Sequence, residues 1–211
     1  SKQTLNARAA SIKNKLFLGE DSLNFLEFID HEYINEISPN AKSYFLKNKA
    51  RDLAIIALIL GTGIRLSECT NADVKHLNLK TLTIEVTRKG GKKDVVSIAP
   101  FTKIYIEKYL DLRKSTYLPD NKEQALFLSK HKGIAKRIDN RTVENLVGKY
   151  SKAFRIEVSP HKLRHTLATR LYSETKNQAL IANQLGHTDL NTSAIYISIV
   201  DDENRKGLDQ L

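Results

Sequence analysis

Six side chains spread along the sequence are of the types that grip a phosphate group and move protons. They are two arginines, a lysine, two histidines and a tyrosine: Arg65, Lys89, His161, Arg164, His187 and Tyr196. Guanidinium groups hold phosphate oxygens with a planar fork, and imidazole, ammonium and phenol groups exchange protons. Taken alone, each has an ordinary interpretation, such as a solvent-facing polar residue, a turn lysine or a packed aromatic ring.

The segment from Gly61 to Glu68 follows an apolar stretch and contains two glycines. A phosphate-binding loop would need a preceding strand and a third glycine, and the sequence offers neither. The glycines instead predict the end of one helix and the start of the next, with Arg65 at the junction. Glu68 lies three residues further on, so it can pair with Arg65 or orient a neighbouring side chain.

The charge of the chain is concentrated in its middle. The 211 residues carry a net charge of +10, and residues 51–200 hold 25 basic and 14 acidic side chains, which is +11. Such an excess favours a polyanionic partner, with DNA, RNA, a membrane surface and an inert basic surface as the alternatives. A hydrophobic content of 41% excludes a disordered tail. No apolar run is long enough to span a bilayer, and the single cysteine favours a reducing cytoplasm.

Periodicity predicts an α+β fold that is mostly helical. Expected helices cover residues 22–33, 41–60, 64–71, 102–113, 140–154, 160–172, 178–185 and 192–199. Strands are expected at 82–87 and 94–98, joined by a turn at 89–92 that carries Lys89, and at 125–129. Residues 130–137 are expected to form a basic loop, and the polar opening, residues 1–15, a linker or arm outside the core.

The six residues in this order, with their surroundings, resemble the tyrosine recombinase (phage integrase) family. The resemblance runs from about Ala50 to Tyr196, and its best stretches are Thr62–Glu68, His161–Thr169 and Gln184–His187. Within the family the chain looks most like the Xer recombinases, and among them the XerS type that acts as a single recombinase. The resemblance implies a catalytic domain with a small three-stranded antiparallel sheet.

The family cleaves a DNA phosphodiester without water, metal or cofactor, leaving a 3′-phosphotyrosyl link and a free 5′-hydroxyl. By resemblance, Tyr196 is the nucleophile. Arg65 and Arg164 bind the phosphate, and Lys89 protonates the leaving 5′-oxygen.

The remaining site residues receive their roles from the same resemblance. His161 accepts the tyrosine proton or bonds the phosphate, and His187 donates to a non-bridging oxygen. Glu68 orients Arg65 or His161 and does not itself contact the phosphate. No metal ligands are expected. Arg137, Arg141 and Lys92 are the expected further DNA contacts.

The family also implies an organisation and partners. Residues 1–20 are expected to be a linker from a missing N-terminal core-binding domain, 21–200 the catalytic domain, and 201–211 an acidic segment that docks on a neighbouring protomer or folds back on its own domain. Expected partners are a double-stranded DNA core site, three further copies in a homotetramer on synapsed DNA, and a DNA translocase activator. The expected location is the cytoplasm, at the nucleoid, with no membrane association.

Several functions share these motifs. Chromosome dimer resolution is the leading interpretation, and an integrase or excisionase of a mobile element is the alternative with the same chemistry. A DNA-binding protein without catalysis and a type IB topoisomerase are the other two.

The chain departs from the family pattern at one place. Many Xer proteins have Thr-His after the tyrosine, whereas this chain has Ile197 and Ser198.

Overall fold

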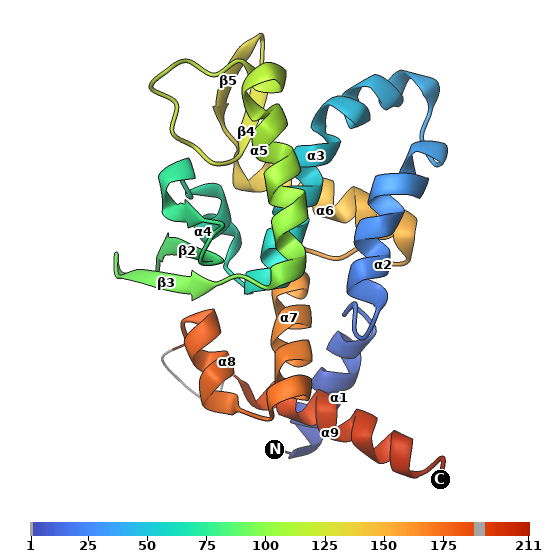
Figure 1. The fold of residues 1–211 in the computed structure, drawn as a ribbon. Coiled ribbons are helices and arrows are strands. Elements are labelled where there is room, and N and C mark those ends of the chain that lie inside the picture. Colours follow the sequence, from blue (N-terminus) through green and yellow to red (C-terminus); the bar gives the residue numbers. More distant parts are fainter. Residues whose placement is uncertain (1, 188–192) are drawn as a thin grey trace.

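The computed structural model describes residues 2–187 and 193–211, and it is mainly helical (Figure 1). The helices are α1 (Lys2–Lys13), α2 (Asp21–Glu27), α3 (Pro39–Thr62), α4 (Leu66–Thr70), α5 (Lys103–Tyr117), α6 (Asn140–Phe154), α7 (Pro160–Thr175), α8 (Gln178–Leu185) and α9 (Ala194–Leu208). Short turns of π- or 3-10-helix are η1 (Phe28–Glu32), η2 (Tyr33–Asn35), η3 (Val74–His76) and η4 (Pro100–Thr102). The predicted α+β, mostly helical class is confirmed.

Helix α3 is the centre of the fold. Every residue from 51 to 62 is buried, because the second half of this helix is apolar on all sides and packs against α5 and α7. Its buried Asp52 accepts hydrogen bonds from Arg51 and from the hydroxyl of Tyr150 on α6, the latter at 2.6 Å. The helix ends at Gly63, whose φ of 69° is the left-handed conformation that favours glycine.

A three-stranded antiparallel sheet lies beside α4 (Figure 1). Its order is β1 (Leu77–Asn78), β2 (Thr83–Thr87) and β3 (Lys93–Ser97), and Ile84 pairs with Val96 in the β2–β3 register. The three-stranded sheet implied by the resemblance and the 89–92 turn are confirmed, but strand β1 was not among the strands expected from the sequence pattern.

The prediction of a basic loop at residues 130–137 is wrong. Strands β4 (Leu128–His131) and β5 (Ile134–Arg137) form a second antiparallel hairpin, closed by Lys132 and Gly133 with positive φ. The strand expected at 125–129 begins only at Leu128, because Ala125 forms a single bridge with Asp73 and the buried residues 126–127 form a bend.

The N-terminal segment is part of the folded unit, so the prediction that residues 1–15 lie outside the core is wrong for the described residues. Helix α1 packs along α9, and Ala9 and Ile12 are buried in a second apolar cluster with Tyr196 and Ile199. Both termini lie at the same end of the molecule, beside these two helices (Figure 1).

Helix α9 is longer than predicted. It runs without a break from Ala194 to Leu208, whereas the sequence indicated a helix that stops near residue 199. Residues 188–192, which include the expected start of this helix, lie outside the described part of the chain. Lys13 on α1 pairs with Asp202 at 3.3 Å and also with Glu203. The first acidic residues of the C-terminal segment thus lie against the chain's own α1.

Candidate active site

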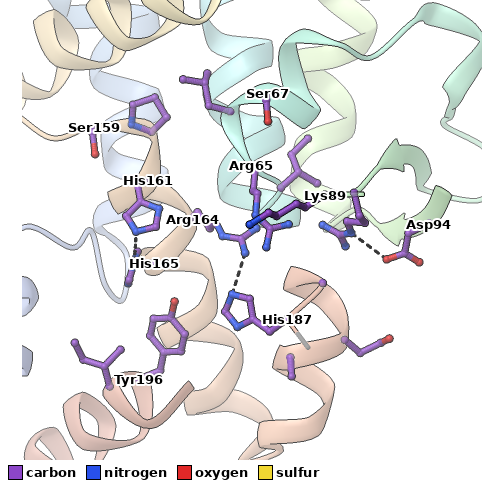
Figure 2. Close-up of a pocket in the computed structure, with 18 of the residues that line it drawn as sticks. Arg65, Ser67, Lys89, Asp94, Ser159, His161, Arg164, His165, His187 and Tyr196 are labelled. Carbon is purple, nitrogen blue, oxygen red and sulfur yellow. Dashed lines mark hydrogen bonds and ion pairs between the residues drawn. The ribbon is translucent and has the colours of Figure 1, made fainter. Parts of the chain in front are cut away.

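A cavity of about 1090 Å³ brings all six residues predicted from the sequence together. They come from the start of α4, the β2–β3 hairpin, α7, the end of α8 and the first turn of α9, and they are Arg65, Lys89, His161, Arg164, His187 and Tyr196. In Figure 2, Arg65 and Arg164 occupy the middle of the cavity, while Lys89 and Tyr196 enter from opposite sides. The fold therefore assembles one cationic site from segments up to 131 residues apart in sequence.

Arg65 is positioned by the way α3 and α4 meet. Gly63 turns the chain, and Arg65 becomes the N-cap residue of α4. Glu68 accepts the Arg65 backbone N–H at 2.8 Å and its Nη1 at 2.9 Å. The Glu68 side chain is 2% exposed, whereas that of Arg65 is 37% exposed. Glu68 thus holds one edge of the Arg65 guanidinium, and the other N–H groups stay open to the cavity.

Arg164 is buried and held by three acceptors. It donates to the carbonyl oxygens of Gly63 at 2.6 Å and Leu185 at 3.0 Å, and its Nη2 lies 3.0 Å from Nε2 of His187. Burial and the nearby charge of Arg65 lower the pKa of Arg164 to about 10, so it remains charged at neutral pH. These bonds fix its orientation toward the cavity.

His187 is an acceptor in this arrangement. Arginine can only donate, so Nε2 of His187 accepts from Arg164 and the ring proton sits on Nδ1. That Nδ1 is buried without a hydrogen-bond partner among the described residues. Burial and the positive charge of Arg164 lower the pKa of His187 to about 4. The imidazole is therefore neutral, and donation from Nε2 to a phosphate requires that Arg164 release Nε2 and that the ring proton move from Nδ1 to Nε2.

Two histidines on α7 face each other near the tyrosine. Nε2 of His161 and Nε2 of His165 are 2.6 Å apart, and the His165 ring packs edge-on against Tyr196 with centroids 5.2 Å apart. Burial lowers the pKa of His161, and burial together with His161 lowers the pKa of His165 to about 3. Both rings are neutral at pH 7, and a neutral imidazole can accept a proton.

Tyr196 lies in the first turn of α9 and is only 2% exposed. Burial raises the pKa of its hydroxyl, and the charge of Arg164 opposes that shift. The phenol is therefore protonated at neutral pH. To act as a nucleophile it must pass its proton to a neighbouring base.

The further DNA contacts expected from the sequence differ in their surroundings. Lys92 is exposed and lines the cavity beside Lys89 on the β2–β3 hairpin, and Arg141 is exposed in the first turn of α6. Arg137 instead bonds within the protein: it donates to Asp73 at 2.5 Å and to the carbonyls of Thr70 and Ala72.

Sequence reasoning did not assign a role to Arg88 or to Arg8, and both line the cavity. Arg88 is buried and bonds Glu68, Asp94 and two backbone carbonyls. Arg8 reaches the cavity from α1, and its charge and that of Lys15 add to burial in lowering the pKa of Lys162. The only available signal for Arg88 was its place beside Lys89, and for Arg8 there was none.

Two further features bear on function. Within residues 2–187 and 193–211, no cluster of three histidine, cysteine or acidic side chains is arranged to hold a metal ion. Over the same residues, no helix has the length and apolar character needed to cross a bilayer.

A family model described as the phage integrase family matches residues 27–203. The chain belongs to the phage integrase family. The matched region includes all six of the cavity residues that were predicted from the sequence. Among curated phage integrase relatives, the chain is 54% identical over 210 residues to the tyrosine recombinase XerS of Streptococcus uberis. It is 53% identical over 209 residues to the tyrosine recombinase XerS of Lactococcus lactis subsp. cremoris.

These XerS alignments take in 100% and 99% of this chain but 59% of each relative. The chain thus spans about 59% of the length of the curated relatives it matches.

Solved structures of phage integrase relatives have the same fold. The crystal structure of XerA recombinase matches with a TM-score of 0.71 and 28% identity, over 92% of this chain and 64% of that one. XerH site-specific recombinase, in a post-cleavage complex with a palindromic difH substrate, matches with a TM-score of 0.72 and 28% identity, over 92% of this chain and 52% of that one. The predicted family and fold are confirmed.

Proposed function

We propose that this chain is the catalytic part of a site-specific DNA recombinase that cleaves and exchanges strands through a 3′-phosphotyrosyl intermediate. The observation that carries the proposal is the cavity itself. It joins a buried tyrosine, the guanidinium groups of Arg65 and Arg164, a lysine and three neutral histidines around a space open to a phosphate. Similarity to XerS relatives over the whole chain supports the same chemistry.

The proposed reaction is an in-line displacement at phosphorus. The Tyr196 oxygen bonds to phosphorus as the bond from phosphorus to the 5′-oxygen breaks. Tyr196 and Lys89 enter the cavity from opposite sides with the arginines between them (Figure 2), which suits attack on one side and departure on the other. Because the phosphate ester is retained as a tyrosyl ester, a second 5′-hydroxyl can reverse the step and join a new strand.

Two protons move in this reaction. The Tyr196 proton passes to a neutral imidazole, and His161 is the proposed acceptor. His165 lies between Tyr196 and His161, since its ring packs against the Tyr196 ring and its Nε2 is close to Nε2 of His161. Lys89 supplies the proton that the 5′-oxygen gains as it leaves. His187 donates to a non-bridging oxygen once the phosphate draws Arg164 away from Nε2 and the ring proton has moved from Nδ1 to Nε2.

Arg65 and Arg164 stabilise the charge that grows on the non-bridging oxygens. Each keeps N–H donors that no acceptor among the described residues takes, since Arg65 uses one side-chain donor for Glu68 and Arg164 uses three. With two guanidinium groups and an ammonium around one phosphate, charge neutralisation needs no metal ion.

We propose chromosome dimer resolution as the biological role, because the relatives at 53–54% identity are XerS proteins. The similarity to a transposon integrase is 20–22% identical and reflects the fold alone, so the mobile-element alternative has less support. The proposal includes cytoplasmic location at the nucleoid, a homotetramer on paired DNA core sites, and activation by a DNA translocase. It also includes a core-binding domain N-terminal to residues 1–20, and assembly contacts in residues 201–211.

Lys92 and Arg141 are the proposed DNA contacts beside the cavity, because both are exposed. Arg137 is the weaker candidate, because its guanidinium is already held by Asp73. Binding should depend steeply on salt, as phosphate contacts release counterions.

The test is a nicked suicide duplex that carries a candidate core site, incubated in EDTA and separated on a denaturing gel. A shifted protein–DNA band with the wild-type protein supports the proposal. Tyr196→Phe should bind the same duplex and give no band. A covalent band from Tyr196→Phe would overturn the assignment of the nucleophile.

A further inference from the structure

Arg88 is a buried arginine that connects three parts of the fold. Its Nε donates to Asp94 on β3 at 3.1 Å, and Nη1 donates to Glu68 on α4 at 3.0 Å. Nη1 and Nη2 also donate to the carbonyls of Leu185 at 3.3 Å and Gln184 at 3.0 Å, at the end of α8. Its side chain is 6% exposed. A buried charge with this many acceptors is held in one orientation.

The backbone of the same residue closes the turn that carries Lys89. The Arg88 N–H donates to the Lys92 carbonyl at 2.7 Å, and the Gly91 N–H donates to the Arg88 carbonyl at 3.0 Å. Lys89, the next residue, is exposed at the tip. Fixing Arg88 therefore fixes the base of the turn from which Lys89 reaches into the cavity (Figure 2).

The end of α8 is shaped to receive this guanidinium. Gly186 has a φ of 66°, and a Cβ there would lie 2.5 Å from Nε of Arg88 and 2.6 Å from its Cζ. The close approach is possible because position 186 has no side chain. Arg88 thus packs directly against the backbone that leads to His187.

We infer that Arg88 is a positioning residue, which anchors the base of the β2–β3 turn to α4 and α8 and so holds the Lys89 ammonium over the leaving oxygen. The inference rests on the proposed function. Arg88 itself is not expected to touch DNA, since its side chain is buried and four of its five N–H donors bond protein acceptors. Its contribution should therefore appear in the proton transfer to the 5′-oxygen.

A substrate with sulfur in place of the bridging 5′-oxygen isolates that step. With this 5′-bridging phosphorothiolate, the tyrosine oxygen bonds to phosphorus and the P–S bond breaks, and the thiolate leaves without gaining a proton. General acid catalysis is worth about 100- to 10,000-fold in rate. Arg88→Gln should therefore cleave the ordinary nicked duplex roughly 100-fold more slowly than wild type. It should cleave the phosphorothiolate duplex at close to the wild-type rate. Lys89→Ala should show the same pattern.

Controls separate positioning from folding. Arg113→Gln removes another buried arginine that bonds backbone carbonyls, at Leu126 and Ala125, away from the cavity. It should lower the melting temperature and leave the ratio of the two cleavage rates as in wild type. Asp94→Ala removes only the hairpin acceptor of Arg88, at a partly exposed site. If Arg88→Gln does not fold, Asp94→Ala should still produce a smaller loss of the same kind.

The outcomes are distinguishable. Equal slowing of both substrates would overturn the inference, because it would place the effect on Arg65 through Glu68 instead of on Lys89. No slowing of either substrate would also overturn it. Failure of the wild-type protein to cleave either duplex would count against the proposed function itself.

Discussion

Replacing Arg164 by lysine keeps the charge of the site and changes the number of hydrogen bonds that this charge can make. A guanidinium has five N–H donors. Three of them bond Gly63, Leu185 and His187, which leaves two for a phosphate. An ammonium has three donors in all, so the same acceptors would take every one of them. Burial lowers the pKa of Arg164, and it would disfavour the charge on a lysine there as well.

The expected size of the effect follows from this count. Removing one donor to the charge of a transition state costs about 100- to 1000-fold in rate, or roughly 3–4 kcal/mol. Arg164→Lys should therefore lose at least this much, close to the loss in Arg164→Ala. Arg65→Lys should lose less than Arg65→Ala, because Glu68 takes only one of the side-chain donors at that position.

The assay is single-turnover cleavage of the nicked duplex at saturating protein, with DNA binding measured separately by fluorescence anisotropy. Saturation removes differences in affinity from the rate. The affinity of Arg164→Lys should stay near that of wild type, because other contacts to the DNA remain. A cleavage rate for Arg164→Lys within tenfold of wild type would refute the argument that the number of free N–H donors at position 164 sets the rate.

Three further predictions concern stability and binding. Asp52→Ala should lower the free energy of unfolding by about 3–5 kcal/mol, because it leaves Arg51 buried without its ion pair; urea unfolding measures this, and a loss under 1 kcal/mol would contradict it. Because the pKa of His165 is about 3 in the fold and about 6.5 unfolded, the unfolded state binds more protons between these values. Stability should therefore fall as pH drops from 6.5, by about 1 kcal/mol per pH unit, and His165→Gln should flatten this slope in urea titrations at several pH values. Arg8→Ala and Lys162→Ala should each weaken DNA binding and reduce the salt slope by about 0.9, as measured by anisotropy across a salt series. An unchanged salt slope for either variant would show that the substituted residue does not contact DNA phosphates.

The six residues that meet in the cavity could be predicted because their order along the sequence, with their surroundings, resembles the tyrosine recombinase family. The turn after α3 sets Arg65, and helical spacing puts His161 and Arg164 on one face of α7. Arg88 was not predicted because three of its four partners, Glu68, Gln184 and Leu185, are distant in sequence. No local pattern distinguishes a buried arginine from a surface one.

The ends of the chain were harder to predict for a different reason. Helix α1 has a narrow apolar stripe that includes Ala9 and Ile12, and its partner α9 lies almost two hundred residues away. The end of α9 carries no apolar stripe, yet the helix continues through the pairs Asp202–Lys206 and Arg205–Asp209 at i, i+4 spacing. Tertiary contact and side-chain pairing, rather than periodicity, maintain these helices.

Gly63 limits how the sequence of this protein can vary. Its φ of 69° penalises any side chain, a Cβ there would lie 2.6 Å from Leu185 and 2.8 Å from Leu167, and its carbonyl is an acceptor for Arg164. A substitution must therefore fit the backbone conformation, the packing and the Arg164 hydrogen bond together, and no single change elsewhere relieves all three constraints. In a library of random single substitutions selected for recombination, position 63 should be among the least tolerant. Gly90 has a positive φ but open space around it, so it should accept more replacements.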